Sequence, residues 1–251
     1  MIENYFRPNT LEEAVRLLKS NEISTYPLGG GNELSQHDAG NISVVDLQNL
    51  KIDKIQIIGD EIEIGSNITL QDFIENADIP KGLKDAAIRE APINTRQTAT
   101  LAGTLVSSKG NSPLAVAMKV AGAKINGEPG TERMDIDYWF AKLESGKPAR
   151  LVVSFIIPKN AKVFYMDISK TPADYPFMYS AFCVVDLQNN WGIGTRKEKV
   201  VFISKEVNTM DEQAILEKAY SHFINNNTLN NYKKQIIKVL FHRLIAEAAK
   251  G

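Results

Sequence analysis

The hydrophobic pattern begins with a helix near the amino terminus. Thr10 and Glu13 have the spacing of a capping box, and the apolar residues that follow fall on one helical face: Leu11, Ala14, Val15 and Leu18. Two apolar runs, at 23–28 and 42–47, then have the composition of strands, the second of them buried. This order predicts a β-α-β type opening, in which a small sheet carries one helix.

The middle of the chain mixes short helices with hairpins. Residues 54–65 alternate between apolar and polar around Gly59-Asp60, which predicts a hairpin. The stretch 95–104, rich in Thr, Ala and Gly, is poor helix material. Helices are expected at about 69–76, 80–91 and 113–121, a second hairpin at 124–126 and 131–135, and a strand at 150–157.

The pattern changes after Pro158, which is the best candidate for a domain boundary. Three strands are expected at about 162–168, 178–187 and 191–204, the last one interrupted or not, with a turn at Asn189-Asn190. Two helices follow at about 211–223 and 229–249. The sequence thus predicts an α+β protein whose first domain, 1–158, has subdomains of about 1–53 and 54–158, and whose second domain is 159–251.

Composition and charge exclude several classes of function. The 251 residues are 43% hydrophobic and 24% charged, with a formal net charge of −1. Such a balance gives no global reason to bind nucleic acid or an anionic membrane. No apolar run is long enough to span a membrane, and the opening MIENYFRPNT lacks the apolar core of a secretory signal. The expected location is the cytoplasm.

Metal chemistry within this chain is not expected. Cys183 is the single cysteine, so the chain forms no internal disulfide and offers no cysteine set for a zinc site or an iron–sulfur cluster. The three histidines, His37, His222 and His242, are scattered along the sequence. Neither a metal site nor a catalytic side chain is predicted.

The most informative segment is the run Gly29-Gly30-Gly31, which directly follows an expected strand. Glycines present bare backbone, and successive N–H groups without Cβ atoms can surround an anion such as a pyrophosphate. A tight turn between strands is the alternative reading. The run is not a Rossmann fingerprint, because Leu34 stands where the third glycine is needed, and no Gly-Lys-Ser/Thr follows to make a P-loop.

A second loop of small residues spans 98–104 and contains three threonines and one glycine. Alone, such a loop is more often explained by packing than by function. Together, the two loops have the composition to hold the two phosphates of a dinucleotide from opposite sides.

Six segments of the chain match short motifs of one known family, in the family's order and spacing. They are Tyr5 to Ala14 (Y-x-R-P-x-(T/S)-L-x-E-A), Gly29 to Leu34 (A-G-G-T-D-L), Val44 to Leu47 (V-V-D-L), Ile64 to Thr69 (I-G-A-x-T-T), Arg96 to Thr104 (R-N-x-A-T-I-G-G-N) and Tyr232 to Leu244 (Y-(K/R)-x-x-(V/I)-x-x-x-L-x-x-R-(A/L)). The chain thereby resembles the FAD-binding medium subunits of the molybdenum hydroxylases, such as xanthine, carbon monoxide and nicotinate dehydrogenases. It looks most similar to the compact bacterial subunits associated with xanthine dehydrogenase or selenate reductase.

This resemblance implies a fold and a cofactor site. The fold is a two-subdomain α/β FAD-binding domain of the PCMH type, followed by a domain with a three-stranded antiparallel sheet packed on helices. The cofactor is FAD, with the flavin ring toward the strand that contains Val152. The residues implied in FAD binding are Pro27, Leu28, Gly29, Gly30, Gly31, Asn32, Glu33, Leu34, Thr100, Leu101, Ala102, Gly103, Thr104 and Val152.

The resemblance also implies partners and an electron path. Electrons pass from a molybdopterin-binding large subunit to a separate iron–sulfur subunit, then through FAD to NAD+ or another acceptor. The lone cysteine agrees with this division of labour. Redox chemistry belongs to the flavin, so no side chain here needs to act as acid, base or nucleophile.

The sequence departs from the family pattern at several positions. Ala102 and Thr104 replace a glycine and an asparagine of the second loop, Ser112 or Pro113 stands in place of an aspartate, and Met166 replaces a basic residue. These changes motivate the alternative of a non-catalytic scaffold subunit with a degenerate flavin site. An unrelated small-molecule binding module would require all six ordered matches to be accidental.

Overall fold

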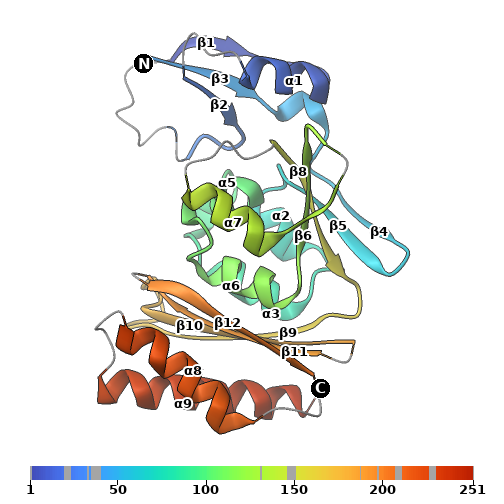
Figure 1. Cartoon of the computed structure of the whole chain (residues 1–251). Coiled ribbons are helices and arrows are strands. Elements are labelled where there is room, and N and C mark those ends of the chain that lie inside the picture. Colours follow the sequence, from blue (N-terminus) through green and yellow to red (C-terminus); the bar gives the residue numbers. More distant parts are fainter. Residues whose placement is uncertain are drawn as a thin grey trace. The chain divides into compact units, whose positions relative to one another are not determined.

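The computed structural model describes residues 2–19, 24–32, 34, 41–130, 132–145, 151–186, 188–196, 198–206, 211–225 and 230–250 (Figure 1). The chain divides into two compact units that are discontinuous in sequence. The first comprises Met1–Ala77, Pro92–Lys109 and Lys124–Ile156, and the second comprises Asp78–Ala91, Gly110–Ala123 and Ile157–Gly251. The contiguous domains expected at 1–158 and 159–251 remain a prediction.

The first unit opens with a parallel sheet in the strand order β1-β3-β2. The predicted helix forms as α1 (Leu11–Leu18), where the Thr10 hydroxyl accepts a hydrogen bond from the Glu13 N–H at 3.2 Å. Ala14 of this helix packs on Val45 and Leu47. The strands are β1 (Ile2–Phe6), β2 (Thr25–Leu28) and β3 (Ile42–Asp46), and a short 3-10 helix, η2 (Gln48–Leu50), follows β3.

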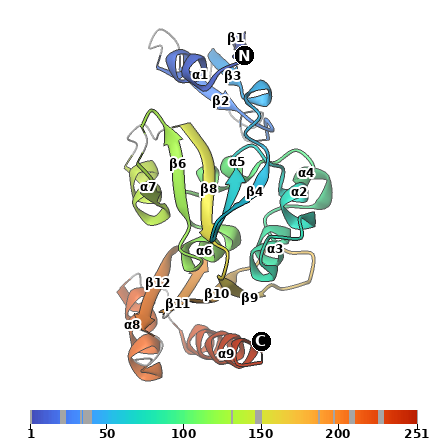
Figure 2. The same ribbon diagram turned by 90° about the vertical axis from the view of Figure 1, so that its right-hand side faces the viewer.

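A five-stranded sheet in the order β4-β5-β8-β6-β7 forms the rest of the strand structure of this unit (Figure 2). The predicted hairpin is confirmed as an antiparallel pair with its turn at Gly59. On this sheet, Trp139 and Phe155 meet edge to face, with ring centroids 6.0 Å apart. The strands are β4 (Ile55–Ile58), β5 (Glu61–Gly65), β6 (Lys124–Glu128), β7 (Met134–Asp135) and β8 (Leu151–Pro158).

The stretch 95–104 is more helical than its composition predicts. Thr100 is an N-cap, and its hydroxyl accepts a hydrogen bond from the Gly103 N–H at 3.2 Å. Threonine is unfavourable inside a helix, but at the N-cap position its hydroxyl stabilises the start of one. The helices of this unit after α1 are α2 (Leu70–Glu75), α4 (Ile93–Arg96), α5 (Leu101–Ser108) and α7 (Ile136–Glu144).

The second unit is built on an antiparallel sheet in the order β12-β11-β10-β9, so it has four strands where three were expected. The expected strand 191–204 is two strands, because the chain reverses after Thr195. The predicted turn at Asn189-Asn190 was wrong: both residues lie within β11, and the preceding reversal is at Asp186, which has a φ of 51°. The strands are β9 (Lys162–Ile168), β10 (Met178–Val185), β11 (Gln188–Thr195) and β12 (Glu198–Glu206).

Helices cover both faces of this sheet (Figure 1). On one face, Trp191 packs edge to face against Phe241, with ring centroids 5.0 Å apart. On the other, Gly192 faces Val116. The helices are α3 (Lys81–Ile88) and α6 (Pro113–Val120) on the Gly192 face, and α8 (Glu212–Asn225) and α9 (Asn231–Ala248) on the Trp191 face. The predicted α+β architecture is therefore confirmed apart from the strand count.

Candidate cofactor site

The glycine run begins where β2 ends, at the edge of the parallel sheet. Pro27 is tolerated in β2 because this is an edge strand. The Leu28 carbonyl accepts a hydrogen bond from the Leu47 N–H at 3.0 Å, and this bond holds the last residue of β2. Gly31 has a φ of 75°, a left-handed conformation that favours glycine. Of the implied site, Glu33 lies outside the described residues.

The second loop packs directly against the first. A Cβ atom on Gly30 would come within 1.6 Å of the Thr98 carbonyl oxygen. A Cβ atom on Gly29 would come within 2.9 Å of the Thr100 hydroxyl oxygen. The Asn32 side-chain amide donates to the Thr98 hydroxyl at 3.1 Å. Two of the three glycines are therefore required by the close approach of the loops, a reason that the sequence alone did not reveal.

The backbone donors of the two loops differ in availability. Within the described part of the chain, the N–H groups of Gly29, Gly30 and Gly31 donate no backbone hydrogen bond. At the start of α5, the Leu101 N–H donates to the Ile68 carbonyl at 2.9 Å, and the Ala102 N–H donates to the Ser66 carbonyl at 3.0 Å. Available amide donors for an anion are thus concentrated in the first loop, while α5 contributes the positive end of its dipole.

The two departures in the second loop have a local explanation. Ala102 lies in the first turn of α5, not at a left-handed position, so its Cβ causes no backbone strain. The Thr104 hydroxyl donates to the Thr100 carbonyl at 2.9 Å. Neither replacement interrupts the helix, since the Thr104 N–H also keeps its bond to the Thr100 carbonyl at 3.0 Å.

Ser66 links the second loop to the strand β8. Its N–H donates to the Val153 carbonyl at 2.9 Å, and its carbonyl accepts from Ala102. Val152, implied near the flavin ring, is buried in β8, where it pairs with Gly127. Ser66 and Asn67 were not among the predicted site residues, although the motif match at Ile64 to Thr69 contains both. Thr98 belongs to the predicted second loop but not to the residues that the resemblance implies in FAD binding.

The other two departures lie in the second unit and have packing roles there. Pro113 is the first residue of α6, where its missing N–H costs no hydrogen bond. The Glu90 carboxylate accepts from the Leu114 N–H at 2.6 Å in the same helical turn. Burial, opposed by hydrogen bonds from Leu114 and Ser112, raises the pKa of Glu90 to about 7. Met166 packs against the hydrophobic core that α8 and α9 form with the sheet.

Two further features are absent from the described residues. No group of three or more His, Cys, Asp or Glu side chains there is arranged to hold a metal ion. Among the same residues, no helix combines the length and apolar character needed to cross a membrane.

Comparisons with known proteins identify the family. The family described as "FAD binding domain in molybdopterin dehydrogenase" matches residues 1–160, and the chain belongs to it. FAD is the cofactor of this family, and the glycine loop, whose amides donate no backbone hydrogen bond within the described residues, fits the diphosphate of FAD. No curated protein sequence gives a significant match.

Solved structures extend the likeness to nearly the whole chain. A chain of Cu,Mo-CO dehydrogenase has a TM-score of 0.76 and 18% identity, covering 98% of this chain and 97% of that one. A chain of quinoline 2-oxidoreductase from Pseudomonas putida 86 has a TM-score of 0.77 and 17% identity, covering 99% and 97%. A chain of reconstituted CO dehydrogenase from Oligotropha carboxidovorans has a TM-score of 0.73 and 17% identity, covering 97% and 96%. At this identity, the similarity establishes the fold alone.

Proposed function

We propose that this chain is the FAD-binding, electron-transfer subunit of a molybdenum-containing hydroxylase or dehydrogenase complex. The observation that carries the proposal is the pairing of two loops, one of which presents three glycine amides that donate no backbone hydrogen bond within the described residues. The residues that hold FAD are those of the first loop, Pro27 to Leu34, and of the α5 start, Thr100 to Thr104, with Val152 toward the ring. When bound, FAD supplies the redox chemistry, and the chain supplies binding and orientation.

The electron path requires partners. Cys183 is buried in β10, and burial raises the pKa of its thiol to about 12, so it is unsuited to act as a ligand or a nucleophile. Clusters must therefore come from a separate iron–sulfur subunit, which receives electrons from a molybdopterin-binding subunit. NAD+ or another carrier accepts them from the flavin, and the complex works in the cytoplasm. The compact bacterial subunits associated with xanthine dehydrogenase or selenate reductase are the expected subgroup.

A scaffold subunit with a degenerate flavin site is the second candidate. It is favoured by the packing of Met166 against a hydrophobic core and by the internal use of the Leu101 and Ala102 amides. The scaffold would join the same complex but hold no flavin.

Colour and co-purification separate the two candidates. A flavin subunit purified with added FAD and then desalted is yellow, with an absorbance band at about 450 nm. Co-expressed with its iron–sulfur and molybdopterin partners, it elutes with them in gel filtration and retains flavin. A complex that assembles without flavin would favour the scaffold, and chains that elute separately at micromolar concentration would contradict both.

A further inference from the structure

A network of polar side chains lies at the edge of the parallel sheet where the glycine loop begins. The three strands β1, β2 and β3 are parallel, so their carboxyl ends share this edge. Phe6 and Pro27 both pair with Val45, and Leu28 pairs with Asp46. Arg7, which follows Phe6, therefore lies level with Asp46 and with Leu28 on the other side of β3, one residue before Gly29.

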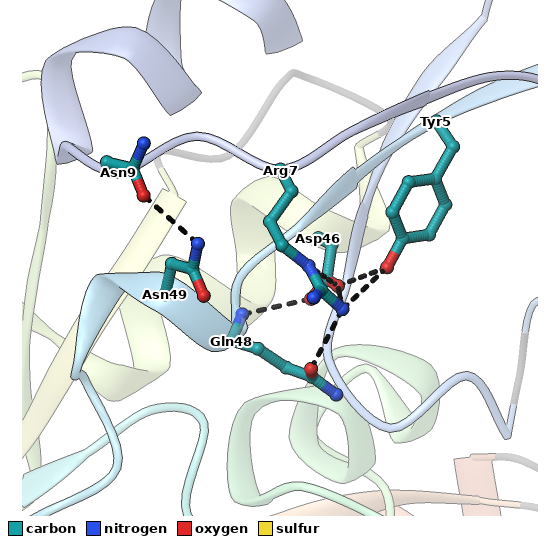
Figure 3. A network of polar contacts seen from close by, with 6 residues as sticks. All are labelled: Tyr5, Arg7, Asn9, Asp46, Gln48 and Asn49. Atoms are coloured by element: carbon teal, nitrogen blue, oxygen red, sulfur yellow. Dashed lines mark hydrogen bonds and ion pairs between the residues drawn. The ribbon is translucent and has the colours of Figure 1, made fainter.

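The centre of this network is the carboxylate of Asp46, whose side chain is 2% exposed. It accepts hydrogen bonds from the Tyr5 hydroxyl, from the Arg7 Nε at 2.8 Å and from the Gln48 N–H at 2.9 Å (Figure 3). The Arg7 guanidinium also donates to the Gln48 side-chain oxygen at 3.0 Å and to the Tyr5 hydroxyl oxygen at 3.1 Å. The Asp46 carboxylate thus ties the end of β1 to the end of β3.

The electrostatic balance keeps Asp46 ionised. Burial acts to raise its pKa, but the hydrogen bonds from Tyr5, Gln48 and Arg7, together with the charge of Arg7, outweigh burial, so the pKa lies below its ordinary value. The buried Asp46 carboxylate holds Tyr5, Arg7 and Gln48 in one geometry. Losing a hydrogen bond from any of these partners would leave the Asp46 charge poorly solvated.

The network reaches the glycine loop through the backbone. Asp46 is the Cα partner of Leu28, and the next residue, Leu47, donates its N–H to the Leu28 carbonyl at 3.0 Å. Leu28 is the last residue before Gly29. The other end of the glycine run is held by the contact of Asn32 with Thr98. The glycines have no side chains of their own to hold them, so their amides take their direction from these two ends.

We propose that Tyr5, Arg7 and Asp46 are positioning residues for the FAD diphosphate: they fix the point at which the glycine loop leaves the sheet and so orient its amides. This inference rests on the proposed function. It assigns a role in cofactor binding to the first of the six motif matches, Tyr5 to Ala14, which is part of neither loop.

Arg133 provides a matched control. It forms an ion pair with Glu61 at 2.6 Å in the same unit, and its side chain is 46% exposed, against 47% for Arg7. This pair lies at the five-stranded sheet, away from the β2 end. Replacing either arginine by glutamine removes one charge and one ion pair from the first unit, but only Arg7 is linked to the glycine loop.

The test measures the affinity for FAD and the visible circular dichroism of bound FAD at saturation, well below the melting temperature. For Arg7→Gln we expect the Kd to rise about tenfold or more, which is the effect of about one lost hydrogen bond to a charged group, with an altered flavin spectrum. Arg133→Gln should stay within about twofold of the wild type, and Arg7→Lys should recover part of the loss. Tyr5→Phe, which removes only a hydroxyl group from a half-exposed ring, should also raise the Kd for FAD. This second variant allows the test to be made if Arg7→Gln does not fold.

Wild-type affinity and an unchanged flavin spectrum in Arg7→Gln or Tyr5→Phe would overturn the inference and leave the proposed function intact. An equal loss in Arg133→Gln would also overturn it, since the effect would then be one of general stability. A wild-type chain that binds no FAD would overturn the proposed function and the inference together.

Discussion

Gly30 lies against the carbonyl oxygen of Thr98 so closely that a Cβ atom on Gly30 would stand 1.6 Å from it. This contact joins two loops that are far apart in the sequence. We therefore predict that Gly30→Ala separates the loops, lowering both the melting temperature of the FAD-free chain and the flavin content. Thermal unfolding monitored by far-UV circular dichroism, with flavin content from absorbance, measures the two effects. A variant with wild-type stability and flavin content would contradict the close approach.

For Gly31 we expect a different outcome of substitution, because this residue has a φ of 75° and a Cβ atom there would meet only the Leu28 side chain. Gly31→Ala should cost about 1 kcal/mol of unfolding free energy through backbone strain. Gly59, with a φ of 60° and nothing within 4 Å, is the matched control in the β4–β5 turn. Both alanine variants should lose a similar amount of unfolding free energy in urea titrations, but only Gly31→Ala should lower the affinity for FAD. Equal FAD affinities for the two variants would mean that the glycine run is only a turn.

Ala102 allows a test of the departure from the family's second loop. Because it lies in the first turn of α5 and its N–H bonds to Ser66, the Cβ atom neither strains the backbone nor removes a donor. Ala102→Gly should therefore lower the unfolding free energy by about 0.5–1 kcal/mol and leave the Kd for FAD within about twofold. A large gain in FAD affinity would show instead that this methyl group obstructs the cofactor.

Glu90 predicts a pH dependence of stability. Its pKa rises from 4.5 to about 7 in the folded chain, chiefly through burial. Between these pH values the folded state holds a proton that the unfolded state releases. The free energy of unfolding should therefore fall as pH rises from about 5 to about 7, by up to about 3 kcal/mol, and change little from this group above that range.

Glu90→Gln should flatten this part of the profile, whereas Glu217→Gln, an exposed substitution on α8, should keep it. Urea denaturation at a series of pH values measures the slope. If the wild type and Glu90→Gln have parallel profiles between about pH 5 and 7, Glu90 does not titrate as described.

The sequence predicted those helices and strands that are marked by a pattern of neighbouring residues. The Thr10 cap of α1, the alternation of the β4–β5 hairpin and the apolar face of α6 were all present in short stretches of sequence and were confirmed. The Glu13 carboxylate accepts from the Asn9 N–H and not from the Thr10 N–H, so the second half of the predicted capping box is shifted by one residue. β1 was missed because its five residues are all exposed, so it has no alternating pattern to detect. The strand count of the second unit was wrong because the short reversal between β11 and β12 carries no glycine or proline to mark it.

The arrangement of the candidate site depended on contacts between distant residues. The glycine run and the Thr-rich loop could be identified by composition, but their mutual packing through Gly30 and Thr98 could not. The same is true of the link from Arg7 through Asp46 to Leu28, which depends on the strand order β1-β3-β2. Hydrogen bonds that occupy the first amides of α5 were also invisible in the sequence.

A thermal-shift titration of the flavin-free chain with FAD, FMN and ATP tests the central claim most directly. A ligand that binds only the folded state raises the melting temperature by mass action. We expect FAD to raise it in a concentration-dependent way, because the glycine loop is proposed to hold the diphosphate, and FMN to do so much less, because it lacks the adenylate half. Because the chain departs from the family pattern at Pro113 and Met166, we expect FAD to be partly dissociable, so that some is lost on purification. No shift with FAD at high micromolar concentration, in a folded and flavin-free sample, would contradict the flavoprotein account and leave the scaffold.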